Sequence, residues 1–148
     1  MAIVLGYDDS PGAGIALAAA IRVAQRLGEP LVLVYGAAVP GGRGEEFRAH
    51  LEALHEMGRS ALEHAVELAT AAGVTTEVEL VDARAAEALL DVAGRHDATM
   101  IVVGTTGESP LKGAVLGSTP HRLLHLSDRP VLCVPVDATE PTSVRPEE

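Results

Sequence analysis

Aromatic residues are scarce in this chain of 148 residues, which holds no Trp, one Phe and two Tyr. Its apolar residues make up 47% of the sequence and are mainly Ala, Val and Leu, so we expect a closely packed aliphatic core. The length fits one domain, which we place at residues 1–136. Residues 137–148 combine Pro, Ser, Thr and charge without periodicity, which predicts a flexible tail.

Cysteine and basic residues are also few. Cys133 is the only cysteine, which excludes an internal disulfide and a zinc site built from cysteines, and its apolar neighbours predict a buried, unreactive thiol. The 11 Lys and Arg stand against 21 Asp and Glu, for a net charge of −10. Nucleic acids and anionic membranes are bound by clustered Lys and Arg, which this sequence lacks. We therefore expect no nucleic acid and no membrane as a partner.

Long hydrophobic runs are missing as well. An acidic pair, Asp8 and Asp9, follows the first apolar run within a few residues, too early for the apolar core of a signal peptide. No apolar stretch approaches the roughly 18 residues that a membrane helix requires. These absences predict a cytoplasmic location.

Short apolar runs alternate with segments of helical periodicity. The runs are continuous, which is typical of parallel strands that are covered on both faces. Residues 74–81 instead alternate between apolar and acidic side chains, which predicts a strand at a sheet edge. With helices between the strands and right-handed crossovers, the fold class is an α/β three-layer α/β/α sandwich with a five-stranded parallel sheet. The continuous runs are residues 3–5, 31–34, 100–103 and 131–134.

Two junctions between a strand and a helix carry residues from which a ligand site can be built. In Tyr7-Asp8-Asp9-Ser10-Pro11, Ser10 can cap the helix and Pro11 suits its first turn. The second junction is Gly117-Ser118-Thr119-Pro120. If the strand order is 3-2-1-4-5, the strands before these junctions are neighbours where the winding reverses, and ligands bind in the crevice there. We expect both hydroxyl-capped helix starts to direct N–H groups into it, which suits phosphate.

A glycine-bearing loop follows the fourth strand. Gly104 and Gly107 permit positive φ and let the main chain approach a ligand, although glycines also serve simple turns. No Gly-Lys-Ser/Thr follows, so the loop is not a Walker motif, and Gly6, Gly12 and Gly14 lack the spacing of a dinucleotide fingerprint. The loop, the helix start and the strand together favour the phosphate of a nucleotide.

These motifs resemble the nucleotide-binding signature of the universal stress protein family. The signature reads Gly104, two residues, Gly107, nine residues and Gly117-Ser118-Thr119, and the first strand with its acidic turn is similar to the family's too. The resemblance covers nearly the whole chain. It implies the ATP-binding subclass, because the loop glycines are complete, and an adenine nucleotide alpha hydrolase-like, Rossmann-like fold.

The resemblance also implies a role for individual residues. Asp8 would lie by the ribose and adenine, with main chain from Gly6 and Tyr7 beside it. Gly36 would contact adenine through its backbone, and we expect its missing side chain to loosen that wall. Val103 would flank the base or sugar. The phosphate contacts are implied for Gly104, Gly107, Gly117, Ser118 and Thr119.

Two positions depart from the family's pattern. Asp9 stands where many relatives have Gly or a larger apolar residue, and it adds negative charge near an anionic ligand unless Mg²⁺ lies between them. Pro120 replaces a residue with a hydroxyl and donates no N–H. The expected ligand is therefore ATP with Mg²⁺. Helix capping alone is the alternative role for Asp8 and Asp9.

The six histidines raise the question of metal binding or catalysis. His121 and His125 have the i, i+4 spacing of two ligands on one helix face, but no third ligand completes the set, which favours a solvated face. No convincing base and no well-placed arginine supports efficient hydrolysis, so we expect a slow ATPase at most.

The last apolar run begins at Val131 and ends at Val136, and at the outer edge of the sheet it would invite strand pairing. An antiparallel homodimer would bury it, and the resemblance implies the same arrangement. The expected function is ATP binding in stress response or signalling. Three alternatives stay open: a nucleotide-independent dimeric interaction module, a binder of another adenine nucleotide such as cyclic AMP, and an adenylate-forming or hydrolysing enzyme.

Overall fold

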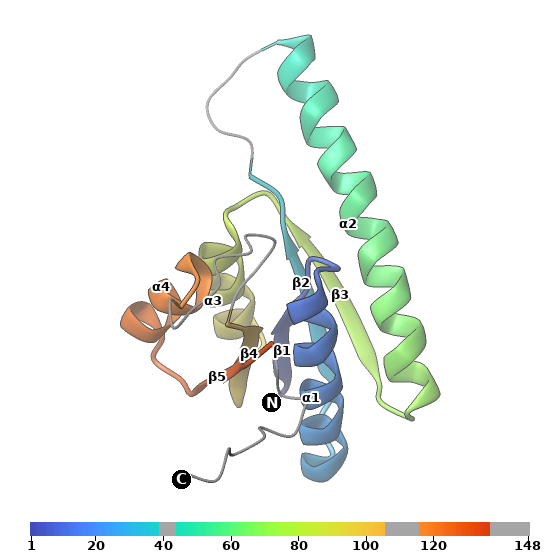
Figure 1. Ribbon diagram of the computed structural model, residues 1–148, viewed down its shortest axis with the longest axis vertical. Helices are drawn as coiled ribbons and strands as arrows, with labels where there is room; N and C mark the ends of the chain where they lie inside the picture. Colours follow the sequence, from blue (N-terminus) through green and yellow to red (C-terminus); the bar gives the residue numbers. More distant parts are fainter. Residues whose placement is uncertain (39–43, 106–115, 137–148) are drawn as a thin grey trace, which may run out of the picture.

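The chain forms a doubly wound α/β sandwich, seen in Figure 1 with the sheet between two layers of helices. The computed structural model describes residues 1–38, 44–105 and 116–136. The predicted tail at residues 137–148, most of the glycine-rich segment at residues 39–44, and Gly107 lie outside these ranges. The elements are β1 (Ile3–Gly6), α1 (Pro11–Leu27), β2 (Leu31–Gly36), α2 (Glu45–Ala71), β3 (Thr76–Val81), α3 (Ala85–Arg95), β4 (Met100–Gly104), α4 (Ser118–Leu126) and β5 (Val131–Val134).

All neighbouring strands of the sheet are parallel, in the order β3-β2-β1-β4-β5. This confirms the predicted fold class and strand order. The winding reverses between β1 and β4, which pair in the register Ile3 with Met100. In open sheets of this kind, ligands bind at the carboxyl ends of the two strands that flank the reversal.

Side chains of β1 explain why the strands read as continuous apolar runs. Ile3 and Leu5 face the core under α1 and α2, whereas Val4 faces the core under α3 and α4. All three side chains are completely buried. Both faces of the central strands are thus removed from water, and their burial is the main stabilising contribution to the fold.

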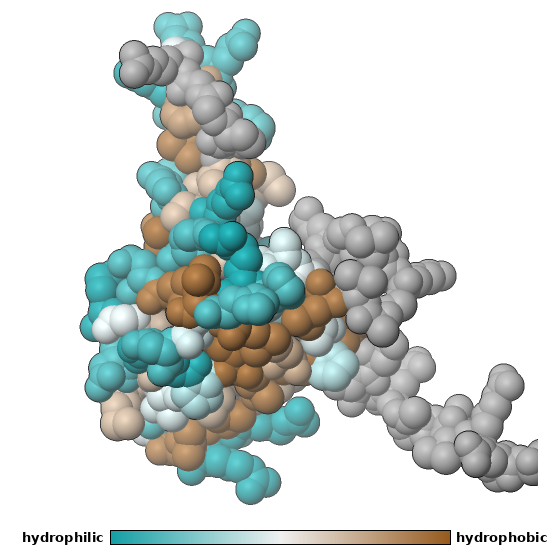
Figure 2. All heavy atoms as spheres, turned by 90° about the vertical axis from the view of Figure 1, so that its left-hand side faces the viewer, coloured by the Kyte–Doolittle hydropathy of each residue, from teal (hydrophilic) through white to brown (hydrophobic). Residues whose placement is uncertain are grey.

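The two edges of the sheet differ in chemistry. At the β3 edge, Glu79 forms a two-pronged ion pair with Arg95 of α3, with N–O distances of 2.7 and 3.0 Å. The β5 edge exposes Leu132 on β5 and Leu124 and Leu126 on neighbouring α4, beside polar residues of that helix that are exposed as well. Figure 2 faces this side of the molecule and shows apolar side chains gathered among polar ones. The apolar edge is the one that the sequence predicted to pair.

Helix α2 is the longest element, with 27 residues, and its first half extends beyond the sheet (Figure 1). His55 ties this half to the end of β3, because its Nε2 lies 2.5 Å from Oδ1 of Asp82. Among the described residues, no helix is both long enough and apolar enough to cross a membrane.

Candidate functional site

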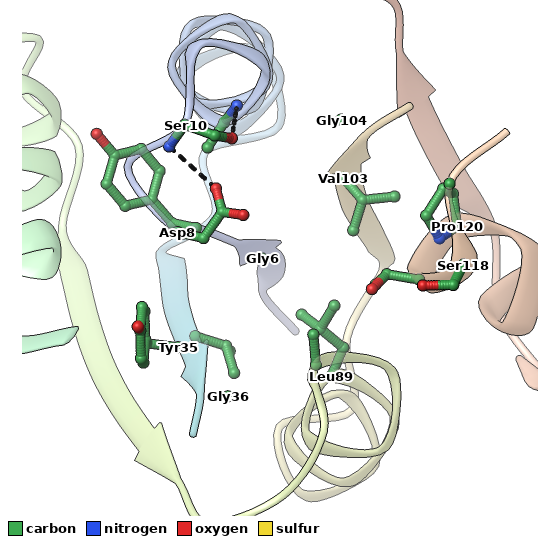
Figure 3. Close-up of a pocket in the computed structure, with 16 residues that line it drawn as sticks. Gly6, Asp8, Ser10, Tyr35, Gly36, Leu89, Val103, Gly104, Ser118 and Pro120 are labelled. Carbon is green, nitrogen blue, oxygen red and sulfur yellow. Dashed lines mark hydrogen bonds between the residues drawn. The ribbon is translucent and has the colours of Figure 1, made fainter. Parts of the chain in front are cut away.

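A cavity of about 330 Å³ opens where β1, β2 and β4 reach their carboxyl ends (Figure 3). This volume is at the lower end of the range typical of small-molecule sites. Its position is the crevice at the winding reversal that the strand order predicts. The lining residues are Gly6, Tyr7, Asp8, Ser10, Ala13, Val34, Tyr35, Gly36, Ala85, Leu89, Val103, Gly104, Gly117, Ser118, Thr119 and Pro120.

The structure brings together every predicted site residue that it describes. Gly107 is the one predicted residue outside the described ranges. Sequence reasoning missed the apolar part of the wall, which comes from Val34 and Tyr35 on β2 and from Ala85 and Leu89 on α3. The β2 residues directly precede Gly36 at the carboxyl end of a strand, so their place in the chain could have indicated them.

The turn between β1 and α1 is held by its own side chains. Ser10, 8% exposed, is the N-cap of α1, and its Oγ accepts a hydrogen bond from the N–H of Ala13 at 3.2 Å. Asp8 Oδ1 accepts one from the N–H of Ser10 at 3.0 Å. The predicted cap at Ser10 is confirmed. Because these N–H groups are already engaged and Pro11 has none, the start of α1 is largely closed to an anion.

Asp9 turns away from the cavity and toward Tyr7. Its φ of 63° is a left-handed conformation that favours glycine, and its Oδ1 accepts a hydrogen bond from the Tyr7 hydroxyl at 2.9 Å. Burial, then this hydrogen bond and the charges of Asp9 and Asp8, raise the pKa of Tyr7 to about 12. The carboxylate of Asp9, which the sequence placed near the ligand, is thus not part of the described wall, and Asp8 is the single carboxylate among the described lining residues.

Gly104 allows α1 and β4 to approach each other. A Cβ atom built on it would lie 3.1 Å from the carbonyl oxygen of Gly12 in the first turn of α1. The φ of Gly104 is not positive, so the conformational freedom that the sequence suggested is not what this position uses. Because Gly104 has no side chain, α1 and β4 can pack closely, and two walls of the cavity come together.

Gly36 closes the wall that its missing side chain was expected to loosen. A Cβ atom on Gly36 would lie 2.9 Å from both the Ala83 carbonyl oxygen and the Ala85 Cα. The main chain between β3 and α3 fills the space of the absent side chain. The expectation of a looser wall is therefore wrong, because backbone from a distant segment packs there.

The start of α4 is arranged differently from that of α1. The helix begins at Ser118, with Gly117 as the N-cap and no side-chain hydrogen bond to cap it, so the predicted hydroxyl cap is wrong. Ser118 and Thr119 lie instead in the first turn and line the cavity. Gly117 is held by a 2.8 Å hydrogen bond from its N–H to the carbonyl oxygen of Thr105. First-turn N–H groups of a helix have no partner within it, which makes this end suited to an anion.

Cationic side chains are absent from the described part of the cavity wall. Nor does any group of three or more His, Cys, Asp and Glu in the described ranges suit a metal ion. A bound anion would therefore depend on main-chain N–H groups, hydroxyls and the dipole of α4.

Three residues singled out in the sequence do not line the cavity. His121 and His125 are neighbours on α4, with ring centroids 4.7 Å apart. Both are exposed, in agreement with the predicted solvated face. Cys133 is partly rather than fully buried, and burial raises the pKa of its thiol, which suppresses the reactive thiolate.

Comparison with known proteins places this geometry in a family. The model of the universal stress protein family matches residues 1–135. The chain belongs to the universal stress protein family. A universal stress protein of Thermus aquaticus is 35% identical over 134 residues, which cover 89% of this chain and 96% of that relative. The chain spans about half the length of several other curated relatives that it matches.

Solved structures of the family agree in fold. One from Burkholderia pseudomallei is 30% identical, with a TM-score of 0.73 over 90% of this chain and 96% of that one. Another universal stress protein, solved in complex with cAMP, is 25% identical with the same TM-score and coverage. The predicted family is thus confirmed.

Proposed function

We propose that this universal stress protein binds an adenine nucleotide in the cavity at the carboxyl ends of β1 and β4, and acts in stress response or signalling. The observation that carries the proposal is that the start of α4 has no side-chain cap. Ser118 and Thr119 present first-turn N–H groups and hydroxyls at the cavity wall, where the positive end of the helix dipole favours phosphate.

The remainder of the wall suits a nucleoside. Val34, Leu89 and Val103 supply an apolar surface for a flat ring, and the contact between Gly36 and Ala85 closes this region. Asp8 lies on the α1 side of the cavity, opposite Ser118 (Figure 3), and its hydrogen bond from Ser10 fixes the carboxylate. A carboxylate so placed accepts hydrogen bonds from ribose hydroxyls.

We propose ATP with Mg²⁺ as the ligand. The described cavity wall offers no cation to a triphosphate, and Mg²⁺ is typically held by one or two carboxylates together with the ligand's phosphates. Because Asp8 is assigned to the ribose, the phosphates and water molecules would supply most of the ligands of the ion. Cyclic AMP is the second candidate, because a relative of 25% identity was solved in complex with it and a single phosphate needs less neutralisation.

Rapid hydrolysis is not part of the proposal. No histidine lines the described wall, and the carboxylate of Asp8 already accepts a hydrogen bond from the main chain. Phosphoryl transfer needs an aligned water molecule and charge stabilisation at the leaving group. We propose slow hydrolysis at most.

The first test is to denature the purified protein and to identify any released small molecule by mass spectrometry. Calorimetry then compares ATP with and without Mg²⁺, and cyclic AMP, on the refolded or ligand-free protein. Gly117→Val should abolish binding, since Gly117 lines the cavity with φ −60° and ψ 164°, a conformation that Val also adopts. Gly94→Ala, on α3 and away from the cavity, is the control. The absence of binding by the unaltered protein, or full affinity in Gly117→Val, would refute the site.

We also propose that two copies associate through their β5 edges. Leu132 is 38% exposed on β5, and Leu124 and Leu126 on α4 are 55% and 56% exposed. Antiparallel pairing of the two edge strands would bury this apolar surface and satisfy the unpaired main chain of the edge. Pro135, directly after β5, would limit the length of the ladder.

A further inference from the structure

Helices α3 and α4 are joined by an ion pair beside the cavity. A guanidinium nitrogen of Arg122 on α4 donates a hydrogen bond to Oε1 of Glu87 on α3. Both helices contribute to the cavity wall, α3 through Ala85 and Leu89 and α4 through the residues of its first turn. Figure 1 shows the two helices lying side by side.

The ion pair lies close in sequence to the lining residues but does not itself line the cavity. Glu87 follows Ala85 by two residues in the first turn of α3. Arg122 follows Ser118 by one helical turn, so the two side chains lie on the same face of α4. A shift of Arg122 relative to α3 would therefore move Ser118 as well.

Few other described interactions hold the start of α4. The helix has nine residues, lacks a side-chain cap, and buries Pro120 and Leu123. Leu123 packs in the core with Leu89, and the hydrogen bond from Gly117 to Thr105 attaches the N-cap to the end of β4. These contacts fix the depth of α4, and the ion pair at Arg122, one turn after Ser118, is its one charged link to α3 among the described residues.

The surroundings of Glu87 keep it ionised. Oε2 is buried without a hydrogen-bond partner among the described residues, although the side chain as a whole is 40% exposed. A hydrogen bond from its own main-chain N–H, the hydrogen bond and charge of Arg122, and the charge of Arg84 hold the pKa of Glu87 below its usual range. Among the described residues, Arg122 is the one side chain that donates a hydrogen bond to this carboxylate.

We propose that Glu87 and Arg122 form a positioning pair, which holds the first turn of α4 against α3 and so sets the geometry of the phosphate end of the cavity. The inference rests on the proposed function. The pair acts through Ser118 and Thr119 rather than by touching the ligand. Its loss should therefore affect ligands that carry a phosphate and spare those that do not.

Glu87→Gln separates this role from a simple effect of charge. Removing a negative charge near the phosphate end would by itself tighten the binding of an anion. The positioning role predicts the opposite sign: AMP binding weakens, by up to about fivefold, which is the most that the loss of a partly exposed ion pair would contribute. Adenosine, which has no phosphate, should keep its affinity. Calorimetry with both ligands measures the ratio of the two dissociation constants.

Matched variants test the pair itself. Arg122→Lys keeps the charge and should retain most of the AMP affinity. The double variant Glu87→Gln, Arg122→Gln should weaken AMP binding no more than the more damaging of the two single changes. The control is Arg95→Gln, which removes an equally exposed arginine, 49% in both cases, from ion pairs with Glu79 and Asp91 at the far end of α3. It should leave both affinities unchanged.

The outcomes distinguish the inference from the proposed function. If the unaltered protein binds neither ATP with Mg²⁺ nor cyclic AMP nor AMP, the proposed function fails and the positioning role fails with it. If it binds ATP but not AMP, the same comparison is made with ATP in place of AMP. If the unaltered protein binds AMP but Glu87→Gln binds it equally well or more tightly, the positioning role alone is overturned. Equal losses for AMP and adenosine would also overturn it, because they would indicate general damage to the cavity.

Discussion

Gly36 and Ala85 meet through their main chains: a Cβ atom on Gly36 would lie 2.9 Å from the Cα of Ala85. The carboxyl end of β2 and the start of α3 thus form one continuous wall of the cavity. The contact involves backbone, which cannot rotate away as a side chain can. The shape of this part of the cavity therefore depends on the absence of a single methyl group.

Gly36→Ala should lower the free energy of unfolding by about 1–3 kcal/mol, since the new methyl group overlaps the main chain at Ala83 and Ala85. It should also weaken nucleotide binding, because the start of α3 must move. Urea denaturation measures the first effect and calorimetry the second. Gly94→Ala, where a Cβ atom meets nothing within 4 Å, should not lower the stability. Equal stabilities for the two variants would argue against this packing.

Tyr7 should make stability fall with pH in the alkaline range. Its pKa is raised from 10.0 to about 12, so between these values the unfolded chain has lost the phenolic proton and the folded chain retains it. The contribution of Tyr7 to the free energy of unfolding is complete below pH 10.0. Above that pH it declines by about 1.4 kcal/mol per pH unit until the pKa of the folded state is reached. Denaturation of the protein and of Tyr7→Phe at increasing pH checks this, since the slope due to Tyr7 should be absent from the variant.

Ser10→Ala should destabilise the protein by about 1 kcal/mol, because the N–H of Ala13 loses its acceptor at the start of α1. Ser10→Gly, which keeps a favoured N-cap residue, should cost only a few tenths of a kcal/mol. Thermal or urea denaturation of both variants gives the comparison. A larger loss for Ser10→Gly than for Ser10→Ala would show that the cap is not the source of the effect.

The positions of the buried strands could be predicted from the sequence because they depend on burial, whereas the strand order 3-2-1-4-5 came with the family resemblance. Val4 and its neighbours on β1 are apolar on both faces, since helices cover both, and this pattern is visible in a single sequence. The cap at Ser10 was predictable because capping is local and involves residues three apart. Parallel strands then bring the two junctions to the same edge of the sheet.

The roles of the glycines could not be predicted, because they depend on what lies opposite in space. Gly36 contacts the main chain before α3, and Gly104 contacts Gly12, segments that are distant in the sequence. A hydroxyl side chain was expected to cap the helix at this junction, but α4 begins at Ser118, with Gly117 as the N-cap. Sequence patterns locate helix ends only to within one or two residues.

Leu132→Lys should convert the proposed dimer to a monomer, because it places a charge on the exposed apolar edge of β5. Val78→Lys is the matched control: Val78 is 52% exposed on β3, at the opposite edge of the sheet. Analytical ultracentrifugation measures the mass of each variant. A monomeric unaltered protein, or dissociation by Val78→Lys alone, would contradict pairing through β5.

The most direct test of the account is a crystal structure of the protein grown with a saturating adenine nucleotide. We expect electron density in the cavity, with phosphate against the main-chain N–H groups of Ser118 and Thr119 and the base beside Val34, Leu89 and Val103. Nucleotide bound at another surface, or an empty cavity despite binding measured in solution, would contradict the central claim.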